Sequence, residues 1–217
     1  MMTLNITRPP GSPFRILCLG AHSDDIEIGC GGTILRLLEE NPAAEIHWVV
    51  IGATGPRKAE AAESANIFLA GAQRKELLIG QFRDGYLPGM WTEIKDFFEA
   101  LKKRCQPDLI LTHYGKDLHQ DHRLVSELTW NTFRNHLILE YEIVKYDGDL
   151  GAPNLFVQLN ASIVRKKIQT IVECFKSQKD KNWFTEDVFS SILRLRGVES
   201  NAPEKYAEAY YCRKIVC

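Results

Sequence analysis

The sequence lacks the paired cysteines and the long apolar runs that would assign it directly to a secreted or a membrane-bound class. Its six cysteines are scattered, and no two of them form a C-x-x-C pair. A chain of 217 residues with 45% hydrophobic content is large enough to bury a core without a disulfide framework. We therefore expect reduced cysteines and a cytoplasmic location.

The sequence also lacks an excess of charge of either sign, because its formal net charge at pH 7 is −1. It offers no general attraction to nucleic acid or to an anionic membrane. No window reaches the roughly 18 apolar residues of a membrane span, and the first ten residues contain no apolar stretch of signal-peptide length. We expect no nucleic-acid partner and no transmembrane segment, whereas a homo-oligomer is compatible with the sequence.

Apolar runs and helical patterns alternate through the first part of the chain. The runs are continuous, as in strands buried on both faces of a parallel sheet, and they lie at 14–19, 45–51, 76–79, 108–112 and, more weakly, 140–144. The helical patterns between them lie at 29–41, 57–70, 91–104 and 121–135. This alternation predicts an α/β, Rossmann-like fold, in which a mostly parallel sheet carries helices on both faces.

The alternation ends near residue 146. A turn-rich stretch at 147–154 precedes two helical patterns, at 162–175 and 185–195, and a short apolar tail. We interpret residues 147–217 as a C-terminal extension of the domain whose core is 1–146, so that a single domain spans 1–217.

Two polar clusters follow the strands predicted at 14–19 and 108–112. The first is AHSDD (21–25) and the second is HYGKDLHQDH (113–122). Ligands of open parallel sheets bind at the carboxyl ends of the strands, and the first and fourth strands are neighbours in the common doubly wound order. The clusters should therefore face each other. His22, Asp25 and His122 would then supply two imidazoles and one carboxylate, the ligand count of a catalytic zinc site with one position open to water.

Each cluster is weak evidence when it is taken alone. Aspartates before a helix are ordinary caps, and a pair of histidines three residues apart is common. The occurrence of both clusters directly after buried strands is what favours a metal site. Asp24 lies beside the predicted ligands and is free to act as a base, and His119 precedes His122 by three residues, so that it can lie over the same site.

These motifs resemble those of the PIG-L/LmbE family of metal-dependent deacetylases, and the resemblance covers nearly the whole chain. AHSDDIEIGCGGT (21–33) is similar to the first metal motif of the family, and THYGKDLHQDH (112–122) is similar to its second histidine motif. Weaker similarities occur at 57–61, 82–88, 146–157, 177–178 and 206–210. Ala21, Ser23 and Ile26 depart from the usual family residues, which concerns the rigidity of the loop more than its chemistry.

The resemblance implies zinc-dependent hydrolysis of the N-acetyl group of an N-acetylglucosamine-containing substrate, with release of acetate and a free amino sugar. Such sites also accept Fe²⁺ in place of Zn²⁺. By position, the resemblance implies that His22, Asp25 and His122 are the metal ligands and that Asp24 is the general base. It also implies that His119 stabilises the oxyanion and that the carboxylate of Asp121 supports this histidine.

Arg57 and Asp84 follow the second and third predicted strands, at the same edge of the sheet. We expect them to bind sugar hydroxyls or a phosphate, although a surface ion pair fits the pattern equally well. A positive charge in the first helical turn opposes the helix dipole by about 0.3–1 kcal/mol, which slightly favours a functional role for Arg57.

Four other residues carry minor expectations. Trp183 is a better candidate for stacking on a sugar than the aromatic residues at helical spacing. His113 is expected to pack within the pocket, and His47 is expected to be structural. Glu208 is expected to pair with an arginine such as Arg194 or Arg196.

Three other functions stay open at this point. A zinc amidase of the same fold could cleave a larger amide of an amino-sugar conjugate. Two histidines and a carboxylate also describe a non-haem iron oxygenase. A carbohydrate-binding protein with a relict metal site would be non-catalytic, and it would need neither Asp24 nor His119.

Overall fold

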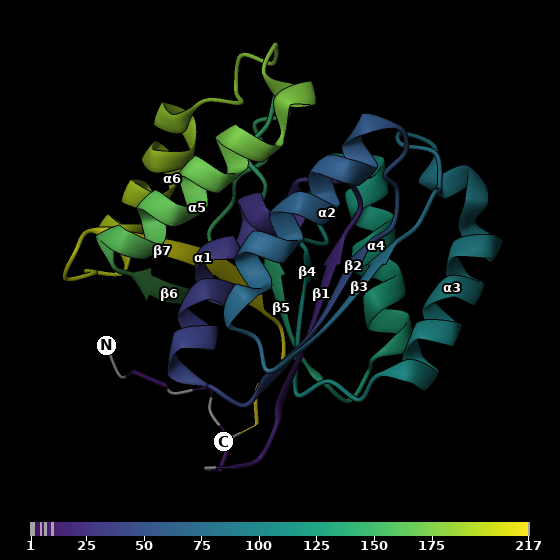
Figure 1. Cartoon of the computed structure of the whole chain (residues 1–217), viewed down its shortest axis with the longest axis horizontal. Coiled ribbons are helices and arrows are strands. Elements are labelled where there is room, and N and C mark those ends of the chain that lie inside the picture. The colour runs from purple at the N-terminus through teal and green to yellow at the C-terminus, as the bar shows by residue number, and fades with distance from the viewer. Residues whose placement is uncertain (1–2, 5, 7, 10, 217) are drawn as a thin grey trace.

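The computed structural model describes residues 3–4, 6, 8–9 and 11–216. The strands of this part of the chain form one seven-stranded sheet with the order β3-β2-β1-β4-β5-β7-β6 (Figure 1). Their bounds are β1 (Phe14–Gly20), β2 (Ala44–Val50), β3 (Arg74–Ile79), β4 (Leu109–His113), β5 (Leu137–Tyr141), β6 (Leu155–Leu159) and β7 (Tyr206–Cys212). Strands β1 to β5 pair in parallel, whereas β7 is antiparallel to both β5 and β6. The predicted α/β class and the pairing of the first and fourth strands are confirmed.

Helices cover both faces of the sheet. They are α1 (Asp25–Glu40), α2 (Pro56–Phe68), α3 (Trp91–Arg104), α4 (Gln120–Thr132), α5 (Ala161–Cys174) and α6 (Glu186–Glu199), with short 3₁₀ turns at Leu69–Gly71, Leu87–Met90 and Lys176–Gln178. Figure 1 shows α1, α2 and α5 in front of the sheet and α3 and α4 behind it. No helix among the described residues is both long and apolar enough to cross a membrane.

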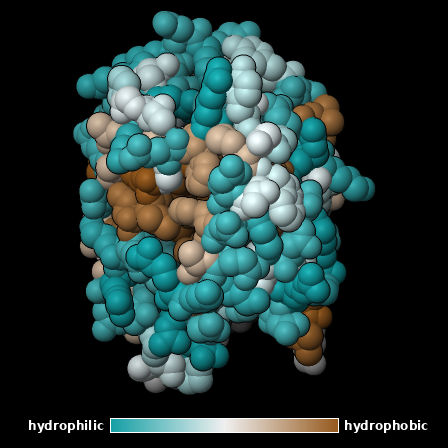
Figure 2. Space-filling view, turned by 90° about the vertical axis from the view of Figure 1, so that its right-hand side faces the viewer, coloured by the Kyte–Doolittle hydropathy of each residue, from teal (hydrophilic) through white to brown (hydrophobic). Residues whose placement is uncertain are grey.

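The central strands β1 and β4 are mostly apolar because both faces of the sheet are buried there, whereas the edge strand β3 begins with the exposed Arg74 and Lys75. In β1, Ile16 and Cys18 join the cluster under α1, α2 and α5, and Leu17 and Leu19 join the cluster under α3 and α4. On the side of the molecule that carries α3, Figure 2 shows an apolar patch among hydrophilic residues. The partly buried residues that pack against the second cluster include Leu78, Phe82 and Phe97.

Helix α1 begins at Asp25, four residues before the predicted start, and it contains three glycines that ordinarily weaken a helix. A Cβ atom at Gly29 would lie 2.1 Å from the Tyr141 ring, and one at Gly31 would lie 2.6 Å from Phe68. The glycines therefore let α1 lie directly against its neighbours, and the packing compensates for their low helix propensity. This close contact fixes the position of the first turn of α1.

The segment after residue 146 adds two strands to the sheet, and one of them was not predicted. Strand β6 has only five residues, and it pairs with β7, about 50 positions further along the chain. No local pattern carries information on so distant a partner. The apolar tail predicted at the C-terminus is β7, and the two predicted helices are α5 and α6.

A buried ion pair fastens this C-terminal segment to α1. Glu208 of β7 pairs with Lys167 of α5 at 2.5 Å, so the expected pairing with Arg194 or Arg196 was wrong. The Glu208 carboxylate also accepts hydrogen bonds from the backbone N–H groups of Gly32 and Thr33, at 2.7 and 2.6 Å. One carboxylate therefore joins β7, α5 and the glycine-rich part of α1.

We expect Lys167→Met to lower the free energy of unfolding by about 3 kcal/mol, because it leaves the buried Glu208 carboxylate without its cation. Urea denaturation measures this loss. Glu40→Gln is the control, since it removes the surface pair of Arg36 and Glu40 and should cost less than about 1 kcal/mol. Equal effects of the two substitutions would contradict the assigned role of the buried pair.

Candidate metal centre

The pairing of β1 with β4 brings the two polar clusters together at the carboxyl edge of the sheet. His22 follows β1, Asp25 is the first residue of α1, and His122 lies in the first turn of α4. All three side chains are buried. Residues that are 100 positions apart in sequence therefore converge because each follows a neighbouring parallel strand.

The atoms that these side chains turn toward one another are spaced as metal ligands are. His22 Nδ1 lies 3.2 Å from His122 Nε2 and 3.4 Å from Asp25 Oδ2, and His122 Nε2 lies 3.5 Å from Asp25 Oδ1. Ligand atoms about 2.0–2.2 Å from a tetrahedral zinc ion are roughly 3.3 Å apart. The two imidazole nitrogens therefore stand at the spacing of two zinc ligands, with a different oxygen of Asp25 near each. Three groups of described residues have ligand atoms that all lie within 4.8 Å of one another: His22, His119 and His122; Asp25, His113 and His122; and His22, Asp84 and Asp121.

Carboxylates bind the outer nitrogens of both imidazoles. His22 Nε2 lies 3.0 Å from Asp121 Oδ2 and 3.0 Å from Asp84 Oδ1, and His122 Nδ1 lies 2.9 Å from Asp117 Oδ2. Because a carboxylate accepts hydrogen bonds, these nitrogens carry the hydrogens, and the lone pairs of His22 Nδ1 and His122 Nε2 face the centre. A histidine that binds a metal is typically held in this way by a carboxylate on its other nitrogen.

The electrostatics of the cluster favour a cation. Burial opposes the charged form of His22, yet Asp25 and hydrogen bonds to Asp121 raise its pKa well above the usual value. Burial likewise opposes ionisation of Asp25, but the imidazoles of His122 and His113 hold its pKa well below the usual range. The centre therefore stabilises positive charge between its histidines and an ionised Asp25, as a site for a divalent metal requires.

Two more histidines flank His122. The His113 ring stacks on the His122 ring with centroids 4.0 Å apart, and the His119 ring lies on His122 at 4.6 Å. His113 Nε2 accepts a hydrogen bond from the backbone N–H of Ala21 at 2.9 Å, and burial lowers the pKa of His113 to about 4. His113 is thus fully buried at the centre, where its Nε2 also lies 3.2 Å from Asp25 Oδ2, in agreement with the expectation that it packs there.

His119 is oriented by the backbone. It is the N-cap residue of α4, and its Nδ1 accepts a hydrogen bond from the backbone N–H of Asp121 at 3.2 Å. The hydrogen of a neutral His119 is therefore on Nε2, which can donate to a ligand. Burial, followed by the nearby His122 and His22, lowers the pKa of His119, so the structure favours a neutral donor at this position.

The sequence led us to expect that the carboxylate of Asp121 holds His119, but its hydrogen-bond partners are other groups. This carboxylate contacts His22 and accepts hydrogen bonds from the backbone N–H groups of Gly85 and Leu87, at 2.6 and 3.2 Å. These bonds place Asp121 between His22 and the loop after β3. The position of that loop, which follows a different strand, could not be derived from the spacing of residues in the second cluster.

Asp117 is the functional residue that the sequence reasoning missed. It lies five positions before His122, and its Oδ1 accepts a hydrogen bond from the backbone N–H of His119 at 2.7 Å. Lys145 neutralises it, with Nζ 3.0 Å from Asp117 Oδ2. The signal that could have found Asp117 is the requirement of a metal-binding histidine for a carboxylate partner.

Asp24 lies beside the candidate ligands but does not act as a cap. It is the N-cap residue of α1, yet its side chain makes no capping hydrogen bond, and it is buried. Burial, followed by the charge of Asp25, raises the pKa of Asp24, while Arg57 opposes this shift. A carboxylate held away from water, with a raised pKa, suits proton transfer.

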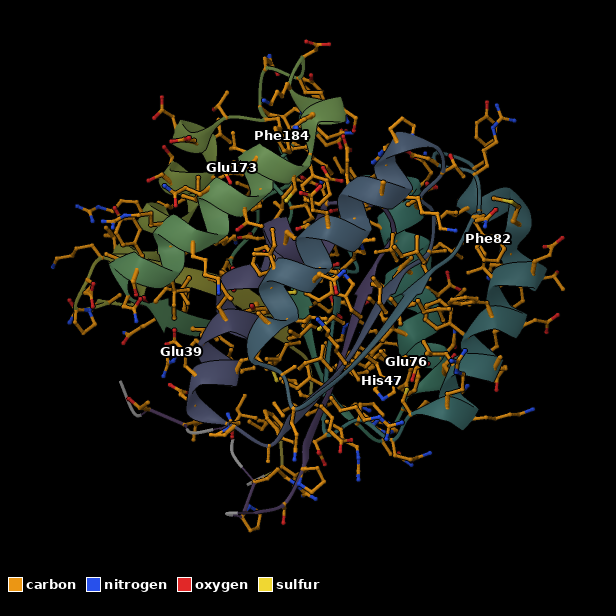
Figure 3. The ribbon with its side chains drawn as sticks, in the orientation of Figure 1. Glu39, His47, Glu76, Phe82, Glu173 and Phe184 are labelled. Carbon is orange, nitrogen blue, oxygen red and sulfur yellow. The ribbon has the colours of Figure 1, made fainter. Side chains whose placement is uncertain are left out.

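Arg57 and Asp84 form an ion pair at the rim of the centre. Arg57 Nε also donates to Ser23 Oγ at 3.1 Å, and Arg57 Nη2 lies 3.5 Å from Asp24 Oδ1. The ion pair considered from the sequence is therefore present, at the edge of the site and not elsewhere on the surface. His47, in contrast, faces Glu76 in the neighbouring strand, in the lower part of the molecule in Figure 3.

A family model described as GlcNAc-PI de-N-acetylase (PIG-L) matches residues 17–133, which is more than half of the chain and includes both clusters. Solved structures of similar fold include three with TM-scores between 0.69 and 0.71. An N,N'-diacetylchitobiose deacetylase from Pyrococcus horikoshii has a TM-score of 0.69 and 22% identity, and the match covers 91% of this chain and 83% of that one. The zinc-inhibited form of a teicoplanin deacetylase has a TM-score of 0.71 and 15% identity, and the match covers 91% of this chain and 97% of that one.

The third structure belongs to an enzyme with a different activity. A 4-carboxy-2-hydroxymuconate hydratase from Pseudomonas putida has a TM-score of 0.69 and 19% identity, and the match covers 94% of this chain and 98% of that one. At these identities the similarity concerns the fold alone. The fold is therefore shared by proteins with different reactions, and the chemistry has to be argued from the side chains of this chain.

We expect His122→Ala to abolish binding of Zn²⁺ or Co²⁺, because it removes one of three candidate ligands. Asp117→Asn should weaken binding by about 10- to 100-fold, since it disturbs only the outer nitrogen of His122. Isothermal titration with each metal measures both effects, and His47→Gln is the control. Unchanged affinity of the His122 variant would contradict the proposed centre.

Proposed function

Because the chain belongs to the PIG-L family of GlcNAc-PI de-N-acetylases, we propose that it is a metal-dependent hydrolase that removes the N-acetyl group of an N-acetylglucosamine-containing substrate. The observation that carries this proposal is the convergence of His22, Asp25 and His122 at ligand spacing, with a buried, uncapped Asp24 beside them. The products are acetate and a free amino sugar.

His22, Asp25 and His122 are proposed to hold the metal, with Zn²⁺ as the first candidate and Fe²⁺ as the second. A bound divalent metal supplies Lewis acidity, which lowers the pKa of water toward about 7 and polarises a carbonyl group. Because a teicoplanin deacetylase of similar fold has a zinc-inhibited form, metal analysis of the purified protein is a necessary part of the test.

Asp24 is proposed as the general base. It would accept a proton from the attacking water at its carboxylate and later deliver that proton to the departing amine nitrogen. Its burial favours the protonated form after the first transfer, and Arg57, 3.5 Å away, favours the ionised form before it. These opposing influences keep the carboxylate able to take up and release one proton.

His119 is proposed to donate a hydrogen bond from Nε2 to the carbonyl oxygen of the acetyl group as negative charge develops on it. The backbone N–H of Asp121 fixes the ring and leaves Nε2 as the donor. Arg57 and Asp84 at the rim are proposed to bind the sugar, since together they present donors and acceptors for hydroxyl groups.

The alternatives make different demands on these residues. A relict binding protein does not require an uncapped, buried Asp24, and an iron oxygenase does not require a base beside its ligands. A larger amide as substrate remains compatible with the same centre. Measurement of acetate release over a panel of N-acetylglucosamine conjugates separates deacetylation from the cleavage of a larger acyl group.

We expect Asp24→Asn to retain the metal and to lower kcat by about 100- to 10,000-fold, because the amide cannot accept the proton. Acetate release together with the metal content measures the two properties. Asp96→Asn on the exposed side of α3 is the matched control. Near-normal turnover of the Asp24 variant would remove this residue from the mechanism.

His119→Ala should lower kcat by about 100- to 1000-fold and leave KM nearly unchanged, because the lost hydrogen bond forms fully only in the transition state. Steady-state kinetics of acetate release distinguish the two parameters. An increase in KM with an unchanged kcat would instead assign His119 to substrate binding.

A further inference from the structure

The turn that follows β5 is tied directly to the candidate metal centre. Lys145 is the anchor, and only 7% of its side chain is exposed. Its Nζ lies 3.0 Å from Asp117 Oδ2 and 2.5 Å from Asp149 Oδ2, and Asp149 Oδ2 also accepts the backbone N–H of Leu118 at 2.7 Å. Gly148, with φ of +62°, allows the chain to turn back so that Asp149 reaches Lys145.

This turn presents Tyr146 to solvent beside a second aromatic residue. Tyr146 is 67% exposed, and its ring meets the ring of Trp183 edge-on at a centroid distance of 6.3 Å. Trp183 is only partly buried, and its ring packs on the buried Phe184 at 5.7 Å. Figure 3 labels Phe184 in the upper part of the molecule, near α5 and α6. We refer to Tyr146 and Trp183 together as the aromatic wall.

One series of contacts links the aromatic wall to the centre. Tyr146 directly follows Lys145, whose Nζ lies 3.0 Å from Asp117 Oδ2, and the same carboxylate oxygen lies 2.9 Å from His122 Nδ1. Beside the wall, Lys181 Nζ lies 5.3 Å from the centre of the Trp183 ring. The aromatic wall is thus connected to the proposed ligand His122 through Lys145 and Asp117.

We propose that the aromatic wall is a second sugar subsite, which binds the pyranose ring attached to the sugar that is deacetylated. The inference rests on the proposed function, and it narrows the substrate to a glycan with at least two pyranose rings. The exposed ring of Tyr146 offers an apolar face that covers the C–H groups of a pyranose, and the partly buried Trp183 beside it extends that surface. Lys181 and Asp147, on the two turns that carry the wall, offer a donor and an acceptor to the hydroxyl groups around such a ring.

A carrier of another kind fits these surroundings less well. An alkyl chain or a lipid tail would cover charged groups without forming hydrogen bonds to them, and such burial is unfavourable. A sugar combines apolar faces with hydroxyl groups at its rim, and binding sites typically combine aromatic side chains with a few placed polar groups in the same manner.

The test compares acetate release from a β-linked disaccharide of N-acetylglucosamine with release from methyl N-acetylglucosaminide. We expect Trp183→Ala to raise KM for the disaccharide about tenfold, which corresponds to about 1.4 kcal/mol. KM for the monosaccharide should change less than twofold. Trp183→Phe, which keeps an aromatic ring, should restore most of the disaccharide affinity.

Tyr146→Ala provides a second variant that does not touch the core, because this side chain is mostly exposed. It should also raise KM for the disaccharide selectively. Leu195→Ala, which removes a 49% exposed apolar side chain from α6, is the control and should leave both substrates unchanged. Equal effects of the wall variants on both substrates, or no effect on either, would overturn the proposal.

A binding measurement separates this inference from the proposed function. Titration with the free disaccharide of glucosamine, which needs no turnover, should change the tryptophan fluorescence of the wild-type protein, and Trp183→Phe should remove most of that change. Absence of acetate release from every conjugate would refute the proposed activity and leave this readout intact. A fluorescence change that persists in Trp183→Phe would refute the aromatic wall itself.

Discussion

The close approach of His22, His122 and Asp25 is the interaction on which the rest of the site depends. Electron-donating atoms on these three buried side chains lie 3.2 to 3.5 Å apart. Such an arrangement is unfavourable without positive charge between the atoms, because burial removes the water that would otherwise screen them. The carboxylates of Asp121 and Asp117 fix the two rings from outside, so the rings cannot turn to relieve the repulsion.

The contacts that fix the side chains of the centre continue into the C-terminal part of the chain. Asp117 fixes His122, Lys145 neutralises Asp117, and the turn that Lys145 anchors packs against Trp183. A second connection runs through the Lys167–Glu208 pair, which holds the glycine-rich part of α1 just after Asp25. Residues far from the proposed metal ligands in sequence therefore help to place those side chains, as outer partners of ligands commonly do in metal sites.

The sequence predicted the parts of this structure that depend on local or periodic information. The parallel strands could be predicted because their apolar runs are continuous, and the meeting of the two polar clusters could be predicted because each cluster begins at the carboxyl end of such a strand. Strand β6 could not be predicted, since the strand with which it pairs, β7, lies about 50 residues further along the chain. The contact between His22 and Asp121 could not be predicted either, because the position of Asp121 depends on the loop at Gly85 and Leu87.

The family and the fold limit the reactions that this chain could catalyse, but they do not identify one reaction. Structures with this fold include deacetylases and a hydratase, and both reactions involve water, so the scaffold cannot decide between them. The decision lies with side chains that act on the leaving group and on the developing oxyanion. Hydrolysis of an amide requires that a proton reach the amine nitrogen, and this is the role proposed for the buried Asp24, which lies beside Arg57. It also requires a donor at the carbonyl oxygen, and His119 is proposed for this role because the backbone leaves the hydrogen of its neutral ring on Nε2.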